Sequence, residues 1–192
     1  MTMESWKNHY WHSVPCMKAR IEKIVEYAGT GKKILEVGCN EGFVSKAMME
    51  AGNDVTPTDI SDEMIEKAKV QFGLEVQKAD ALNLPFGDDS FDVVVAGEVL
   101  EHLTNPFKGL SELFRVAKER VIITLPIGEY WLGELTHFWE LNASFIDHDS
   151  AEEIPAPKHI LVLCWDRRRD DQLKDIPPFD TALHKKKHSI GG

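Results

Sequence analysis

Four acidic residues form the clearest chemical pattern in this sequence. Each lies at or just after the end of a stretch that predicts a β-strand: Glu36, Asp59, Asp80 and Glu98. Because open α/β sheets bind ligands outside the carboxyl ends of their strands, such an ordered set predicts one ligand site. Carboxylates there suit a ribose diol or a cation better than a pyrophosphate. An adenosyl sulfonium meets both requirements.

A glycine-containing turn follows the first predicted strand, in the segment ILEVGCNEG (34–42). Such a turn lets the backbone approach a ligand closely and aims the amides of a helix start at it. A purely structural turn also favours glycine, so Gly38 and Gly42 alone leave both interpretations open. Phe43 stands where the dinucleotide fingerprint has its third glycine, and the sequence contains no G-x-x-x-x-G-K-[ST] phosphate loop.

Strand-like runs alternate with helical periodicity up to about residue 126, which predicts right-handed crossovers and a doubly wound, mostly parallel α/β sheet. The consecutive valines 93–95 indicate a strand buried on both faces. The predicted strands are Lys33–Val37, Asp54–Thr58, Leu74–Lys78, Phe91–Ala96, Arg120–Leu125 and His159–Trp165. Predicted helices cover 14–28 and 43–51, follow the N-caps Ser61 and Asn105, and include an aromatic segment over 131–145.

Composition limits the class of protein. The 192 residues include 22 basic and 32 acidic ones, for a net charge of −10, which argues against nucleic-acid binding as the main task. The sequence shows neither a secretion signal nor a stretch that could span a membrane, and its three cysteines form no C-x-x-C pair. We expect a cytoplasmic protein with a single domain over 1–165 and a polar, mobile tail over 166–192.

The region from Lys33 to about Pro126 resembles the class I S-adenosylmethionine-dependent methyltransferases of the type 11 group, which have a Rossmann-like fold. The matching segments are ILEVGCNEG (34–42), TDISDEMIEKA (58–68), KADALNLPFGDDSFDVVVAGEVLEHL (78–103) and LSELFRVAK (110–118). Their order and spacing agree over roughly half of the chain, which is more specific than any single motif.

The resemblance implies how S-adenosylmethionine would be held at its methionine end. Gly38 and Gly42 would flank the methionine part, and Glu36 would stabilise the loop between strand and helix. Glu98 and Val99 would line the same side of the cofactor.

The resemblance also implies the contacts of the nucleoside end. Asp59 would hold the ribose hydroxyls and Ile60 would pack against adenine. Asp80 would accept from the adenine amino group, and Ala81 would supply a backbone amide. Asn40 departs from the family, which usually has a glycine there, but asparagine tolerates the left-handed backbone.

Two histidines are candidate catalytic residues. Methyl transfer needs a base only if the acceptor must lose a proton; alignment alone can supply much of the acceleration. His102 follows the fourth predicted strand and is the best-placed base, although it fits a backbone-bonding role at a helix start equally well. His137 lies in the aromatic segment, where related folds form acceptor pockets; that segment could instead be core or a dimer surface.

Three further groups have ligand-like spacing without a cysteine to join them, so we predict solvated surface and no metal site. They are His9/His12, Asp147-His148-Asp149 and His184/His188. Tyr10, Trp11 and His12 could form a flap over the cofactor or simply pack the first helix.

The resulting prediction is methyl transfer from S-adenosylmethionine to a small-molecule acceptor, with a pocket that a second subunit could complete. One alternative is methylation of protein or RNA; the basic run Lys185–Lys187 is the only feature that favours RNA, and the acidic body opposes it. Another is a non-catalytic binding module, which Asn40 admits. A nicotinamide-dependent oxidoreductase is disfavoured by the missing third glycine.

Overall fold

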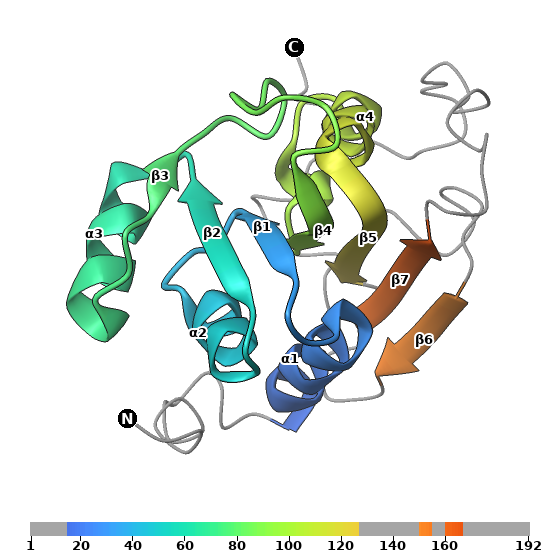
Figure 1. Cartoon of the computed structure of the whole chain (residues 1–192), viewed down its shortest axis with the longest axis horizontal. Helices are drawn as coiled ribbons and strands as arrows, with labels where there is room; N and C mark the ends of the chain where they lie inside the picture. The colour runs from blue at the N-terminus through green and yellow to red at the C-terminus, as the bar shows by residue number, and fades with distance from the viewer. Residues whose placement is uncertain (1–14, 127–149, 155–159, 167–192) are drawn as a thin grey trace, which may run out of the picture.

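The computed structural model describes residues 15–126, 150–154 and 160–166 of the chain (Figure 1). In this part of the chain the helices are α1 (Pro15–Ala28), α2 (Phe43–Glu50), α3 (Asp62–Phe72), α4 (Pro106–Val116) and a 3-10 helix (Leu100–His102). The strands are β1 (Lys33–Val37), β2 (Asp54–Asp59), β3 (Gln77–Lys78), β4 (Phe91–Gly97), β5 (Ala117–Pro126), β6 (Ser150–Ile154) and β7 (Ile160–Asp166).

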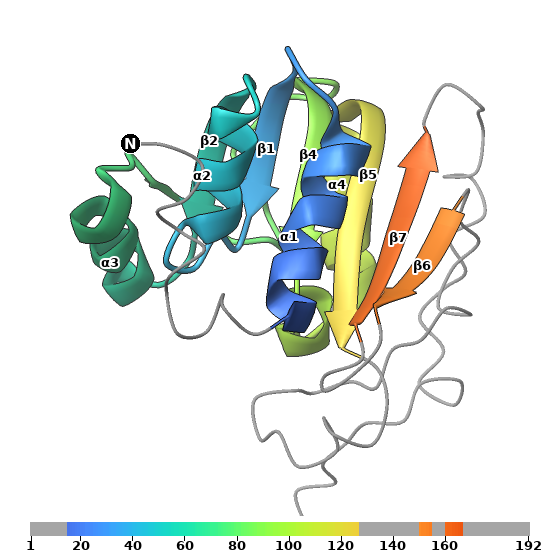
Figure 2. The ribbon, with the colours of Figure 1, turned by 90° about the horizontal axis from the view of Figure 1, so that it is seen from below.

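The strands form one sheet in the order β3-β2-β1-β4-β5-β7-β6. Strands β1 to β5 are parallel, and β7 runs antiparallel to both β5 and β6. Figure 2 shows α1 and α2 against one face of this sheet and α4 on the other. The predicted doubly wound, mostly parallel α/β sheet is therefore confirmed.

Both faces of the sheet are covered by apolar side chains. The cluster under α1 and α2 includes Ile24, Ile34 and Met48, and the cluster under α4 includes Leu35 and Leu110. Valines 93–95 are at most 1% exposed, as a strand between two helical layers requires. Such burial, at ~25 cal/mol per Å² of apolar surface, is the main force that holds the strand ends in register.

Local signals explain where the helices begin and end. Ser61 caps α3 by accepting from the Met64 amide at 3.4 Å, and Asn105 caps α4 by accepting from the Lys108 amide at 3.0 Å. Gly73 ends α3 in the left-handed conformation. At the end of α1, the Arg120 guanidinium donates to the Tyr27 carbonyl, one of the last carbonyls of the helix.

The structure differs from the predicted elements in three places. The predicted strand Leu74–Lys78 is wrong over most of its length, because only Gln77–Lys78 pairs with β2; Leu74 is buried without belonging to the ladder. Strand β5 begins at Ala117, directly after α4. Strand β6 was not anticipated, and Asp166, placed in the tail by prediction, ends β7. The aromatic segment 131–145 and residues 167–192 lie outside the described residues.

Candidate cofactor site

The sheet brings the ends of four parallel strands together in the order β2-β1-β4-β5. Backbone hydrogen bonds continue this ladder into the loops. The Cys39 amide donates to the Thr58 carbonyl at 2.9 Å, and the Glu98 amide donates to the Thr124 carbonyl at 3.0 Å. The segments that follow β1 and β4 therefore start side by side at the edge where parallel α/β sheets bind ligands.

Asp59 ends β2 and is held by backbone amides on both sides. Its Oδ2 accepts from the Asn40 amide and its Oδ1 from the Ser61 amide, both at 2.9 Å. The side chain is 8% exposed. Because each carboxylate oxygen has a second lone pair, both oxygens can still accept a hydroxyl. The two amide bonds thus fix the carboxylate in one orientation, as recognition of a diol requires.

The loop after β1 adopts the left-handed backbone at three positions. Gly38, Asn40 and Gly42 have φ of 71°, 51° and 86°. Asparagine therefore takes the conformation that a glycine would take at position 40. A Cβ added at Gly38 would lie 2.5 Å from Val99 Cγ2, and one at Gly42 would lie 2.4 Å from Leu74 Cδ1. Both the left-handed backbone and the close approach of these side chains therefore favour glycine at positions 38 and 42.

Glu36, a residue of β1, is buried against α2, with 3% of its surface exposed. Its carboxylate accepts a short hydrogen bond from the Ser45 hydroxyl of α2, and its carbonyl accepts from the Thr58 hydroxyl at 2.8 Å. Desolvation by burial raises the pKa of Glu36 from 4.5 to about 7, although Ser45 and the charge of Arg20 oppose the rise. Glu36 therefore fastens α2 to β1 beside the glycine loop.

Arg20 is a residue of the site that sequence reasoning missed. This α1 side chain is 7% exposed and its Nη1 donates to the Thr124 hydroxyl at 3.5 Å. Its guanidinium lies close to Gly97 at the end of β4: a Cβ added at Gly97 would be 2.9 Å from Arg20 Nη1. Its Nε is buried with no hydrogen-bond partner among the residues that the structure describes. A buried guanidinium with spare donors suits a carboxylate.

One signal in the sequence could have identified Arg20. It lies three residues after Met17 and four before Ile24, on the apolar stripe of the first helix. An arginine on a buried face is rare unless it has a partner.

The predicted nucleoside end lies beyond β2. Ile60 is 60% exposed, which leaves an apolar surface beside Asp59. The Ala79 amide donates to the Asp59 carbonyl at 3.0 Å, so the segment after β3 starts next to β2. Asp80 is exposed and accepts from the Leu82 amide at 2.8 Å, whereas Ala81 is buried.

Arg115 of α4 anchors the segment that carries Asp80 and Ala81. Its guanidinium donates to the Leu84 carbonyl at 3.0 Å, to the Phe86 carbonyl at 2.7 Å and to both carboxylate oxygens of Glu112. Glu112 in turn accepts from the Leu84 amide at 2.9 Å. The hydrogen bond from Arg115 lowers the pKa of Glu112. This bidentate pair ties residues 84–86 to α4.

His102 is the last residue of the 3-10 helix after β4. Its amide donates to the Val99 carbonyl at 3.0 Å, and its Nε2 lies 3.9 Å from Oε1 of the buried Glu101. The imidazole is 38% exposed. The backbone bond matches the structural alternative for this residue, and the exposure leaves the ring accessible. His137, the second candidate base, lies outside the described residues, as do the three ligand-like histidine groups.

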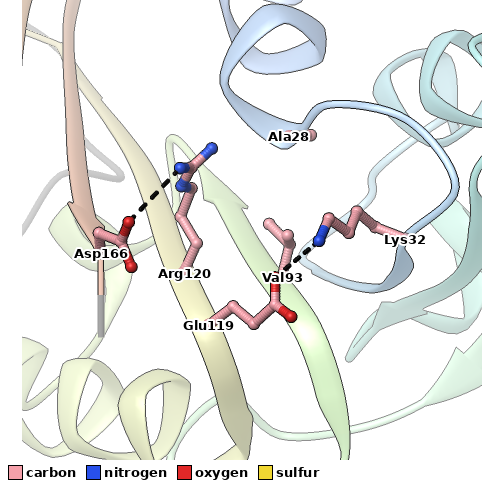
Figure 3. Close-up of a pocket in the computed structure, with 6 residues that line it drawn as sticks. All are labelled: Ala28, Lys32, Val93, Glu119, Arg120 and Asp166. Atoms are coloured by element: carbon pink, nitrogen blue, oxygen red, sulfur yellow. Dashed lines mark hydrogen bonds and ion pairs between the residues drawn. The ribbon is translucent and has the colours of Figure 1, made fainter. Parts of the chain in front are cut away.

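A small pocket of about 110 Å³ lies away from these strand ends. Figure 3 shows it between the end of α1 and the first residues of β5, with the ion pairs Lys32–Glu119 and Arg120–Asp166 in its wall. Its charged residues are paired with each other, so it offers no feature that demands a ligand.

In the described ranges, no three His, Cys, Asp or Glu side chains are placed to hold a metal ion. Nor is any described helix long and apolar enough to cross a membrane.

Comparison with known proteins shows which family and which fold the chain is similar to. Residues 35–125 match the family described as Methyltransferase domain. A demethylmenaquinone methyltransferase of Clavibacter sepedonicus is 37% identical over 99 residues, which cover 48% of this chain and 40% of that protein. A malonyl-[acyl-carrier protein] O-methyltransferase of Erwinia billingiae is 29% identical over 172 residues, 87% of this chain and 58% of that protein.

Solved structures agree on the fold. Magnesium protoporphyrin IX methyltransferase from Synechocystis PCC 6803, solved with bound SAH, superposes with a TM-score of 0.67 at 16% identity, over 79% of this chain and 83% of that one. The sheet is thus the Rossmann-like sheet of class I methyltransferases.

The similarity over residues 35–125 is to the class I methyltransferase domains of the type 11 group, and it implies S-adenosylmethionine as the cofactor. The chain spans about half the length of the curated relatives that it matches.

Proposed function

We propose that the chain transfers a methyl group from S-adenosylmethionine to a small-molecule acceptor. The observation that carries this proposal is the pairing of two fixed groups at the strand ends. Asp59 presents a carboxylate with free lone pairs at the end of β2, and Arg20 has a buried guanidinium with a spare donor near the ends of β4 and β5. A nucleoside diol and an amino-acid carboxylate are the two ends of S-adenosylmethionine.

The residues of the site fit this cofactor in charge. Asp59 would hold the ribose hydroxyls and Ile60 would cover the adenine. Asp80 would accept a hydrogen bond from the adenine amino group, and the Ala81 backbone amide would donate one to the adenine. Glu98 and Val99 would line the methionine side together with the Gly38–Gly42 loop, and Arg20 would bind the carboxylate. S-adenosylmethionine supplies a methyl group that is already activated by a positively charged sulfur.

The protein's own contribution to the reaction would be alignment. The acceptor atom must lie in line with the carbon–sulfur bond, and the partly buried Val99 and the buried Leu100 would exclude water from that region. If the acceptor carries a proton, His102 is the described side chain placed to take it, since its ring is accessible next to the β4 turn. We propose this role for His102 and keep His137 as a second candidate base.

The relatives support a small or carrier-bound acceptor. Their names are demethylmenaquinone methyltransferase, ubiquinone biosynthesis O-methyltransferase and malonyl-[acyl-carrier protein] O-methyltransferase. Those acceptors belong to the relatives. For this chain, the homodimer and the cytoplasmic location stay predictions; the described cysteines, Cys39 and Cys164, are both buried.

The test is a transfer assay with methyl-labelled S-adenosylmethionine and fractionated cell extract. We expect label in the small-molecule fraction with the wild-type chain and, at a cofactor concentration below saturation, about tenfold less with Asp59→Ala. Label in protein or RNA would instead establish the alternative acceptor class. Cofactor binding without label in any fraction, even at saturating cofactor, would favour the non-catalytic module. The Asp54→Ala variant, which changes an exposed carboxylate at the other end of β2, is the matched control.

A further inference from the structure

The turn after β4 contains a residue in a costly backbone conformation. Glu98 has a φ of 58°, in the left-handed region that residues with a Cβ enter only when their surroundings hold them there. It directly follows Gly97, the last residue of β4. The neighbouring contacts must therefore stabilise this turn.

Thr124 of β5 makes two contacts with Glu98. Its carbonyl accepts from the Glu98 amide at 3.0 Å, and its hydroxyl donates to Glu98 Oε1 at 2.8 Å. The hydroxyl also lies 3.5 Å from Nη1 of Arg20, which can only donate. Because a threonine hydroxyl has a single proton, the donation from Arg20 directs that proton to Glu98. Thr124 is 1% exposed, so water does not compete for these bonds.

The left-handed turn has a consequence for the neighbouring loop. It places Val99 so that Cγ2 fills the space over Gly38, 2.5 Å from where a Cβ would be. The segments after β1 and β4 are thereby packed against each other. These are the two segments that would line the methionine side of the cofactor.

We propose that Thr124 is a positioning residue that locks Glu98 in the left-handed conformation and so sets Val99 against Gly38. Arg20 orients the hydroxyl of the lock. The expected effect on ligand binding rests on the proposed function. The contacts by which Thr124 holds Glu98 lie within the protein and do not depend on a ligand. It assigns a role to a buried threonine outside every methyltransferase motif identified in the sequence.

The test compares two variants that remove the same carboxylate. Glu98→Ala keeps the cost of a left-handed backbone, whereas Glu98→Gly removes it. Calorimetry with S-adenosylhomocysteine should show that Glu98→Gly binds about tenfold more tightly than Glu98→Ala. Thr124→Val should weaken binding about tenfold, and Thr124→Ser, which keeps the hydroxyl, should stay within about twofold of wild type. Ile122→Val, a change on the same strand and face, should lower the Tm while binding stays at the wild-type level.

A ligand-free measurement separates failure of the lock from failure of the proposed function. Thermal unfolding should show that Thr124→Val lowers the Tm more in the wild-type background than in the Glu98→Gly background. If Thr124→Val lowers the Tm equally in both backgrounds, the lock is wrong; it is also wrong if wild type binds the ligand and Glu98→Ala and Glu98→Gly bind it equally. If wild type fails to bind at millimolar S-adenosylhomocysteine while the two backgrounds differ in Tm, the lock holds and the proposed function falls.

Discussion

Replacing Glu36 with glutamine should change how the stability of the protein depends on pH. In the folded protein, burial raises the pKa of this carboxyl from 4.5 to about 7. Below about pH 4.5 the group is protonated in both the folded and the unfolded chain, so its contribution to stability is fully present. Between about pH 4.5 and 7 the unfolded chain has released this proton while the folded protein still holds it, so the contribution to stability falls as the pH rises and is lost above about 7.

The size of the effect follows from the two pKa values. A difference between 4.5 and about 7 corresponds to ~3 kcal/mol, since each pKa unit is worth about 1.4 kcal/mol. The free energy of unfolding of wild type should therefore fall by ~3 kcal/mol relative to Glu36→Gln between about pH 4.5 and 8. Glutamine keeps an acceptor for the Ser45 hydroxyl, so the variant preserves the local contact.

The assay is urea unfolding of both proteins at a series of pH values, with the free energies subtracted. Glu112→Gln is the control of opposite sign. The pKa of Glu112 is lowered by its bond to Arg115, so its contribution is present at neutral pH and is lost as the pH falls below about 4. A flat difference between wild type and Glu36→Gln across this range would refute the conclusion that burial raises the pKa of this carboxyl.

Three further predictions concern the site. Asp59→Ala should weaken S-adenosylmethionine binding at least about tenfold in calorimetry, because two hydrogen bonds to a charged acceptor are lost, and an unchanged Kd would remove Asp59 from the ribose. Arg20→Met should abolish the preference for binding S-adenosylmethionine over its decarboxylated form. The control Lys18→Met, on the exposed side of α1, should keep this preference. If the preference survives in Arg20→Met, another group binds the carboxylate. Arg115→Ala should lower the free energy of unfolding by about 2–3 kcal/mol and increase amide exchange in 80–90; unaltered exchange there would contradict the anchoring role.

The elements with a regular pattern were predictable from the sequence. The run of valines in β4 and the caps at Ser61 and Asn105 are local signals, and the structure confirms each of them. Strand β3 shows the limit of such signals. Leu74 is apolar because it packs beneath Gly42, and that contact between distant segments produces the same pattern as a strand.

The site was predictable to the extent that its residues follow strand ends. The order of the strands brings Asp59, Glu36 and Glu98 to one edge, as expected from their positions in the chain. Arg20 and Thr124 were missed because their role depends on α1 lying across β4 and β5, a packing that no spacing in the sequence expresses. The packing roles of Gly38 and Gly42 likewise emerge only from the side chains that occupy the space above them.

A crystal structure of the chain with S-adenosylhomocysteine would show directly whether the cofactor binds at these strand ends. We expect the ribose diol on the Asp59 carboxylate, the adenine beside Ile60 and the amino-acid carboxylate on Arg20. A ligand bound away from the carboxyl ends of β1, β2 and β4, or a ribose turned away from Asp59, would contradict it.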